Sequence, residues 1–348
     1  MSDSPSRLLP VNVISGFLGS GKTTLLKAVL ESESYGDTAV LINEYGEVGF
    51  DNLLLGKISE DVVLLKSGCV CCTIRGELSE ALLDLLYQRE EGLIPPFKRV
   101  IIETTGLASP GPIASTITAD STLRYHIRPG ATVTVVDAIN AQQSQQDHFV
   151  WAEQVAAADK LVMSKAEMAT HTQIEEVTYQ VQAINPTAVL LGSDAQAQPS
   201  SELFEDGPHI KCWKPEQVQG WLGPKHRKYT MTENEHLHGV QSFRLRFQGA
   251  VDWTCFGIWL SMLLNRHGRN ILRVKGVLHV HGDPRPVVLH GVQHTIHPPE
   301  HIDDWPKDQN DSNLIFITRG LDGAAITSSL NEFMSAISEH PLPRILHE

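Results

Sequence analysis

Short runs of β-branched and other apolar residues alternate with amphipathic stretches through the first half of the chain. This alternation predicts a parallel sheet made of strand–helix–strand crossover units. The strands are expected at residues 11–15, 38–43, 62–66, 99–104, 131–136, 160–164 and 188–192. Helices are expected between them, including 23–31 and 78–89, where leucine recurs at helical spacing. The first half is therefore expected to be an α/β domain.

The pattern changes between residues 193 and 239, where proline, glycine and polar residues dominate, as is typical of a connecting segment. Beyond it we expect strands at 242–248, 271–281, 287–294 and 314–319 and helices at 253–267 and 324–337. These elements predict a smaller C-terminal α+β domain. The expected organisation is a first domain over 1–195, a linker over 196–239 and a second domain over 240–348.

Charge and cysteine usage narrow the classes of partner and compartment. The chain of 348 residues carries 28 Lys+Arg and 41 Asp+Glu, a net charge of −13, which repels nucleic acid and anionic lipid. No apolar run approaches the roughly 18 residues of a membrane span. Three of the five cysteines crowd into residues 69–72, unlike a disulfide framework, and no export signal is recognised at the N-terminus. We expect a cytoplasmic protein that binds neither nucleic acid nor membrane.

A phosphate-binding loop follows the first expected strand. Residues 16–24 read GFLGSGKTT and fit G-x-x-x-x-G-K-[ST] between a strand and a helix. Its glycines let backbone N–H groups surround phosphate oxygens, Lys22 neutralises phosphate charge, and Thr23 is placed to bind Mg²⁺. The predicted nucleotide-binding residues here are Gly16, Gly19, Ser20, Gly21, Lys22, Thr23 and Thr24.

Such a loop needs an acidic group at the end of a neighbouring strand, to hold Mg²⁺ directly or through water. Glu103, at the end of the strand RVIIE, is the favoured candidate, and Lys22 and Glu103 are the predicted catalytic pair. Gly106 follows closely and would let the backbone approach a γ-phosphate. Asp137, at the end of VTVVD, is the second candidate.

The identity of the base is predicted from the end of the strand at 160–164. Guanine is usually read by Asn/Thr-Lys-x-Asp, and this chain has Ser164-Lys165-Ala166-Glu167. Glu167 offers the same two acceptor oxygens from one methylene further out, whereas Ser164 cannot reproduce every contact of an asparagine. We expect Lys165 and Glu167 to favour guanine with relaxed selectivity. The alternative is that both side chains are merely solvated.

A thiol cluster lies between these motifs. Cys69, Cys71 and Cys72 fall within four residues, and thiolates select Zn²⁺ and related ions. Glu47 is the carboxylate most able to join them. Spacing alone leaves a metal site, a redox pair and a buried thiol cluster open. In the second half, several histidines suggest a His-rich surface: His279, His281, His290, His294, His297 and His301.

Taken in order, the segments GFLGSGKTTLL, NEYGEVGFD, SGCVCC, IIETTGLASP, VTVVDA and EQVAAADKLVMSKAE resemble the CobW-type P-loop GTPases, which are metallochaperones related to the urease and hydrogenase nickel-insertion GTPases. The tail, with ILRVKGVLHV and LIFITRGLD, is similar to the CobW C-terminal domain. The resemblance implies a P-loop NTPase fold with a mainly parallel sheet flanked by helices, followed by a smaller α+β domain.

The resemblance also implies a function. It implies a low-turnover GTPase that uses Mg²⁺, cycles between GTP and GDP, and binds Zn²⁺, Co²⁺ or another transition metal at Cys69, Cys71 and Cys72. The metal would pass to client metalloproteins under nucleotide control, and a homo-oligomer is compatible with this activity. Three departures stand out: Ser164 replaces the usual Asn, Ile42 precedes Asn43 where some members carry an acid, and the His-rich linker of several relatives is reduced to His236 and His238.

Two other functions remain open at this point. A zinc-responsive GTP-binding regulator would share every motif but would transfer no metal to a client. A P-loop kinase would move the γ-phosphate to a small molecule and would require an acceptor pocket, commonly under a lid. The chain contains no Arg-rich lid segment. Client transfer distinguishes the regulator from the chaperone.

Overall fold

The computed structural model describes residues 8–43, 63–67, 74–204, 239–302, 305 and 311–347. The chain divides into two compact units, one of residues 1–178 and 188–208 and the other of residues 179–187 and 209–348. The three-part division predicted from the sequence stays a prediction. Within the described residues, no helix has both the length and the apolar character needed to cross a membrane.

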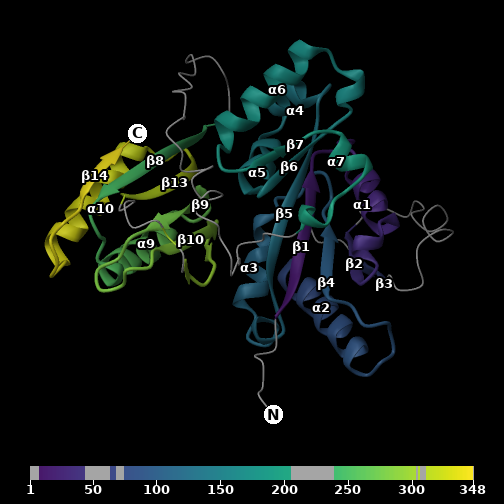
Figure 1. Ribbon diagram of the computed structural model, residues 1–348, viewed down its shortest axis with the longest axis horizontal. Helices are drawn as coiled ribbons and strands as arrows, with labels where there is room; N and C mark the ends of the chain where they lie inside the picture. The colour runs from purple at the N-terminus through teal and green to yellow at the C-terminus, as the bar shows by residue number, and fades with distance from the viewer. Residues whose placement is uncertain are drawn as a thin grey trace. The chain divides into compact units, whose positions relative to one another are not determined.

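The first unit contains a sheet whose paired strands all run parallel, in the order β3-β2-β4-β1-β5-β6-β7 (Figure 1). The strands are β1 (Leu9–Gly16), β2 (Thr38–Asn43), β3 (Val63–Ser67), β4 (Arg99–Glu103), β5 (Ile127–Asp137), β6 (Lys160–Ser164) and β7 (Val189–Leu191). The predicted α/β architecture is confirmed. Because β1 lies between β4 and β5, the phosphate-binding loop that follows it is flanked by the ends of both strands.

Helices connect these strands and cover both faces of the sheet. The α-helices are α1 (Lys22–Glu31), α2 (Ile74–Glu90), α3 (Gly111–Ala119), α4 (Ala141–Asp147), α5 (Phe149–Ala157), α6 (His171–Ile184) and α7 (Asp194–Ala197). Short 3₁₀ turns lie at Glu33–Tyr35, Leu123–Tyr125, Ala166–Met168 and Ser201–Leu203. Leu25 and Val29 of α1 pack with Ile14 on one face, and Leu82 of α2 packs with Val13 on the other.

Strand β5 begins four residues earlier than the predicted 131–136, although Pro129 and Gly130 lie in its first half. The register of β1 against β5 shifts between Val11 and Val13. At this shift the Asn12 carboxamide accepts a hydrogen bond from the Ala131 N–H at 2.9 Å and donates one to the Val100 carbonyl at 3.4 Å. The side chain therefore supplies a bond that the interrupted ladder lacks.

The second unit contains a sheet in the order β11-β10-β9-β13-β8-β14, with β12 beside β10, and its named strand pairs are antiparallel (Figure 1). Its elements are β8 (Val240–Gln248), α9 (Trp253–His267), β9 (Ile271–Leu278), β10 (Val287–Val292), β11 (Thr295–Ile296), β12 (Glu300–His301), β13 (Asp311–Arg319), α10 (Gly323–Ile337) and β14 (Arg344–His347). The core between sheet and helices includes Phe247, Phe256, Phe316 and Leu330.

Two strands of this unit end earlier than predicted. Strand β9 ends at Leu278, because the His279 N–H donates to the Ser312 hydroxyl at 2.7 Å and the chain then bonds Val251 through His279 and His281. Strand β10 ends at Val292, because Gln293 adopts a left-handed φ of 52° that turns the chain into β11. The helices expected at 253–267 and 324–337 match α9 and α10 to within one residue.

Candidate nucleotide-binding site

The candidate site lies at the carboxyl ends of four adjacent strands. Strand β1 ends at Gly16, β4 at Glu103, β5 at Asp137 and β6 at Ser164. The carboxyl edge is where parallel α/β sheets bind their ligands. The sheet therefore brings the loop at 16–24, both candidate acids and the start of the base motif to one edge.

Two glycines of the loop are required by its geometry. Gly16 has a φ of 141°, and a Cβ there would lie 2.4 Å from the Val135 carbonyl oxygen. Gly21 has a φ of 97° and stands immediately before α1, where no side chain caps the helix N-terminus. An uncapped first turn presents its N–H groups and the positive end of the helix dipole to an anion.

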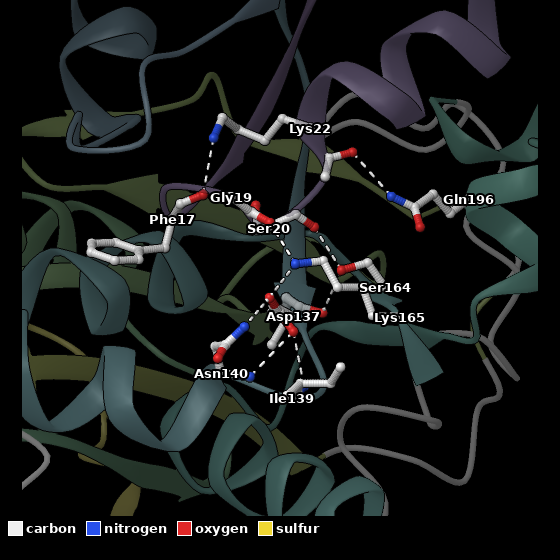
Figure 2. Close-up of polar contacts among 12 residues, drawn as sticks. Phe17, Gly19, Ser20, Lys22, Asp137, Ile139, Asn140, Ser164, Lys165 and Gln196 are labelled. Carbon is white, nitrogen blue, oxygen red and sulfur yellow. Dashed lines mark hydrogen bonds and ion pairs between the residues drawn. The ribbon is translucent and has the colours of Figure 1, made fainter. Parts of the chain in front are cut away.

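Lys22, the first residue of α1, is buried and turned back over the loop. Its Nζ donates to the Phe17 carbonyl oxygen at 3.0 Å (Figure 2). Burial lowers the pKa of the Lys22 ammonium, and the charge of Glu103 opposes that shift. A buried cation whose charge is disfavoured by its surroundings is stabilised when a polyanion binds beside it.

Thr23 and Glu103 come together from neighbouring elements. The Thr23 hydroxyl donates to Glu103 Oε1 at 2.8 Å, and Glu103 itself is buried. The hydroxyl of Ser20 and that of Thr105 are buried and have no hydrogen-bond partner within the described part of the chain. Buried hydroxyls without partners are costly, so their presence around the loop indicates a place that a polar ligand completes.

On the other side of the loop, Lys165 connects β6 to the phosphate-binding loop. Its Nζ lies 2.6 Å from Asp137 Oδ2 and 2.9 Å from the Gly19 carbonyl oxygen (Figure 2). The backbone of Lys165 is left-handed, with a φ of 58° and ψ of 22°, which is uncommon for a residue with a Cβ. These two bonds fix the ammonium group despite that conformation.

Three successive carbonyl groups of the loop accept side-chain hydrogen bonds from this side. Gly19 bonds Lys165, Ser20 bonds the Ser164 hydroxyl at 2.6 Å, and Gly21 bonds the Gln196 amide at 3.0 Å (Figure 2). Gln196, on α7, was not predicted from the sequence. The sequence feature that could have indicated Gln196 is its position shortly after the last strand of the sheet, which ends at the same carboxyl edge.

Asp137 accepts hydrogen bonds from several donors. Besides Lys165, it accepts from the Ile139 N–H at 2.8 Å, the Asn140 N–H at 3.2 Å and the Asn140 side-chain amide at 2.9 Å. Burial alone would raise the pKa of Asp137, but these donors outweigh it and hold the pKa below the usual value. A carboxylate engaged in this way fits an anchor for Lys165 better than a ligand of Mg²⁺.

The remaining predicted residues fall into two groups. Thr24 and Glu167 are exposed, Glu167 in the 3₁₀ turn directly after Lys165. The predicted metal ligands Glu47, Cys69, Cys71 and Cys72 lie outside the described residues, as do His236 and His238. Across the described ranges, no group of three or more His, Cys, Asp or Glu side chains is arranged to hold a metal ion.

The histidines of the second unit, which suggested a His-rich surface, are in part buried. His290 and His297 are each 5% exposed, whereas His294 and His301 are exposed. His281 stacks on His340 with ring centroids 4.5 Å apart. The suggestion was wrong for His290 and His297, because the sequence pattern does not show whether a face is covered by other parts of the chain.

Comparison with protein families gives two matches in chain order. Residues 10–191 match the CobW/HypB/UreG nucleotide-binding domain, and residues 240–334 match the cobalamin synthesis protein cobW C-terminal domain.

Individual relatives match over most of the chain. The chain is 29% identical over 310 residues to the zinc chaperone YjiA of Escherichia coli, covering 89% of this chain and 93% of YjiA. It is 29% identical over 369 residues to the zinc chaperone CobW of Pseudomonas aeruginosa, covering 92% and 90%. A crystal structure of Zn(II)-bound YjiA GTPase superposes with a TM-score of 0.68 at 24% identity, covering 94% of this chain and 99% of that one.

Proposed function

Because the chain belongs to the CobW family of P-loop GTPases, we propose that it couples hydrolysis of Mg·GTP to delivery of a transition metal to client metalloproteins. Zn²⁺ is the first candidate, since the relatives YjiA and CobW are named zinc chaperones, and Co²⁺ or another transition metal is the alternative. The metal would be held by Cys69, Cys71 and Cys72, with Glu47 as a further ligand.

The hydrogen bond between Thr23 and Glu103 carries the nucleotide half of this proposal. A hydroxyl and a carboxylate at the base of a phosphate-binding loop are the oxygen donors that Mg²⁺ uses beside a triphosphate. The residues present therefore fit the ion: Thr23 would bind it, and Glu103 would hold it directly or through water. When bound, Mg²⁺ neutralises charge on the β- and γ-phosphate oxygens.

Hydrolysis places specific demands on Lys22. A water oxygen bonds the γ-phosphorus while the bond from that phosphorus to the β–γ bridging oxygen breaks, giving GDP and phosphate. Negative charge grows on the bridging oxygen. We infer that the Lys22 ammonium exchanges the neutral Phe17 carbonyl for phosphate oxygens, because a charged acceptor binds an ammonium more strongly. The buried position of Lys22 strengthens that interaction.

The base is proposed to lie beside Lys165. The aliphatic stem of Lys165, held at its tip by Asp137 and Gly19, offers an apolar surface for a purine ring. Glu167 is two residues further on and exposed, so its carboxylate is able to turn toward the two N–H groups of guanine. Guanine selectivity is then expected to depend on Glu167, and the orientation of the base on Lys165.

Purification of the full chain in two nucleotide states tests the proposal. The tagged chain is held in GDP or in a non-hydrolysable GTP analogue, co-purifying proteins are identified, and zinc and cobalt are measured in each fraction. The Lys22→Ala variant is the control. We expect bound metal and a metalloprotein recovered in one nucleotide state only.

The outcomes separate the competing functions. Absence of metal in both states would contradict the proposal. In a second step, the metal-bound chain is mixed with the metal-free form of the partner that co-purified with it, and GTP is added. If the partner then contains no metal, the result would support the zinc-responsive regulator. Transfer of the GTP γ-phosphate to a small molecule rather than to water would support the kinase.

A further inference from the structure

Gln154, a buried residue of α5, bonds the loop that follows the predicted catalytic acid. The residue is only 1% exposed. Its side-chain Nε2 donates to the Gly106 carbonyl at 3.1 Å and to the Ala108 carbonyl at 3.0 Å. One amide group therefore bonds two carbonyls of the loop between β4 and α3. The sequence analysis assigned no role to this residue.

That loop lies against the phosphate-binding loop on its other side. A Cβ on Gly106 would lie 2.6 Å from the Leu18 backbone nitrogen, so Gly106 and Leu18 are in close contact. At its start, the Thr104 N–H donates to the Ile14 carbonyl at 3.0 Å. The loop is thus held between β1 and Leu18 on one side and Gln154 on the other.

The residue that precedes helix α5 contacts the phosphate-binding loop directly. His148, immediately before α5, stacks on Phe17 with ring centroids 4.7 Å apart. The Thr134 hydroxyl of β5 donates to the Gln154 backbone carbonyl at 2.9 Å, which fixes the helix on the sheet. Helix α5 and the residue before it therefore touch both the phosphate-binding loop and the loop between β4 and α3.

The chemistry at Gln154 requires an amide. Two carbonyl acceptors fix the orientation of the side chain, because only the NH₂ group can donate to both. Its Oε1 is then buried and has no hydrogen-bond partner among the residues described. Packing alone does not explain a buried amide with an unsatisfied oxygen, since an apolar side chain of the same length would fill the space without that cost.

Holding these two carbonyls fixes the peptide group between Gly106 and Leu107 and the one between Ala108 and Ser109. In a trans peptide the N–H of one residue points opposite to the carbonyl of the residue before it. With the Gly106 and Ala108 carbonyls directed to α5, the N–H groups of Leu107 and Ser109 are directed away from α5. The orientation of these two peptide groups therefore depends on the Gln154 side chain.

We propose that Gln154 is a positioning residue for GTP hydrolysis, which acts by holding the Thr105–Ala108 loop in place for the γ-phosphate. The proposal rests on the GTPase activity alone and not on metal delivery. GDP has no γ-phosphate for the loop to approach. Loss of the amide is therefore expected to affect GTP and its analogues far more than GDP.

Three variants of the full chain test this role. Gln154→Met removes both donors and keeps the length of the side chain, and Gln154→Glu keeps the shape but places a carboxylate against two carbonyl oxygens. Thr134→Val is the matched control, since it removes a buried hydrogen bond to the same residue without touching the loop. The measurements are kcat and KM for GTP, affinity for GDP and for a non-hydrolysable GTP analogue, and thermal unfolding.

For Gln154→Met we expect kcat to fall about 10- to 100-fold, as for a misplaced catalytic loop. GDP affinity should change less than about threefold, while the GTP analogue binds more weakly. Gln154→Glu should lower kcat at least as much. If the Met variant does not fold, the kcat of the Glu variant tests the proposal in its place. If Gln154→Met leaves unchanged both kcat and the ratio of the affinities for the GTP analogue and GDP, Gln154 only supports packing. An equal loss of kcat in Thr134→Val would lead to the same conclusion. Hydrolysis that persists in Lys22→Ala would instead overturn the nucleotide site itself.

Discussion

Lys165 and Asp137 form a 2.6 Å ion pair across the ends of β6 and β5. The Asp137 side chain is 9% exposed and that of Lys165 is 31% exposed, so water screens the pair only in part. The same ammonium bonds the Gly19 carbonyl. The end of β6, the end of β5 and the phosphate-binding loop are therefore connected through the Lys165 ammonium.

We expect Asp137→Asn to lower the free energy of unfolding by about 1–2 kcal/mol, because the amide loses the charge that pairs with Lys165. GDP should also bind more weakly, since Lys165 is no longer held against Gly19. Urea unfolding and GDP titration of the two proteins measure both effects. Equal stability and equal GDP affinity would show that the ion pair has no role.

This loss should depend on pH in a defined direction. The folded-state pKa of Asp137 lies below the ordinary value of 3.8, so its contribution is complete above pH 3.8 and disappears as the pH falls through the folded-state pKa. The difference in stability between the two proteins should therefore be constant near neutral pH and shrink in acid. A difference that grows as the pH falls would contradict the assignment.

The strands of the first sheet were predicted well from the sequence, because the features that indicate a strand lie within the strand itself and the residues next to it. Each core strand is a short apolar run between breakers, and the loop at 16–24 is recognisable wherever it follows a strand. The start of β5 was missed because Pro129 and Gly130 normally end a strand, and the compensating bond comes from Asn12, more than a hundred residues away.

The site was predictable only in part for the same reason. Lys22, Thr23 and Glu103 follow from motif and strand ends, and the structure brings them together. Gln154 and Gln196 act on backbone carbonyls, and a carbonyl group has no sequence signature. The available sign of Gln154 was a polar residue, next to Glu153, in the otherwise apolar helix FVWAEQVAA of α5.

Lys22→Ala should abolish GTP hydrolysis and weaken Mg·GTP binding while leaving the fold intact. The ammonium acts on phosphate, and burial already disfavours its charge, so the fold does not depend on that charge. We expect kcat to fall by at least about 100-fold with little change in thermal unfolding. Turnover equal to that of the unmodified protein would remove the phosphate-binding assignment.

The chain should prefer GTP to ATP. Glu167→Ala should reduce that preference and leave the thermal stability of the chain nearly unchanged. Glu167 is exposed, so its removal disturbs no packing, while the base loses an acceptor for its two N–H groups. Competition of GTP and ATP for a fluorescent GDP analogue measures the preference. Equal competition by ATP in the unmodified protein would contradict the guanine interpretation.

Replacing Cys71 and Cys72 together by serine should remove one tight Zn²⁺ site per chain. Thiols lose protons when they bind the metal, so zinc affinity of the unmodified protein should fall as the pH is lowered, and loading should release protons. Titration with a chromogenic chelator, with Cys255→Ser as the control for a buried isolated thiol, measures the site. A double variant that binds one equivalent with unchanged affinity would show that the cluster is not the site.

The central claim is that nucleotide and metal binding are coupled, and zinc affinity in the two nucleotide states tests it most directly. Chelator competition is carried out on the full chain saturated with GDP and then with a non-hydrolysable GTP analogue. We expect zinc affinities that differ by about 5- to 150-fold, and by linkage zinc must shift the preference for GTP over GDP by the same factor. Identical zinc affinities in the two states would contradict a nucleotide-controlled metallochaperone.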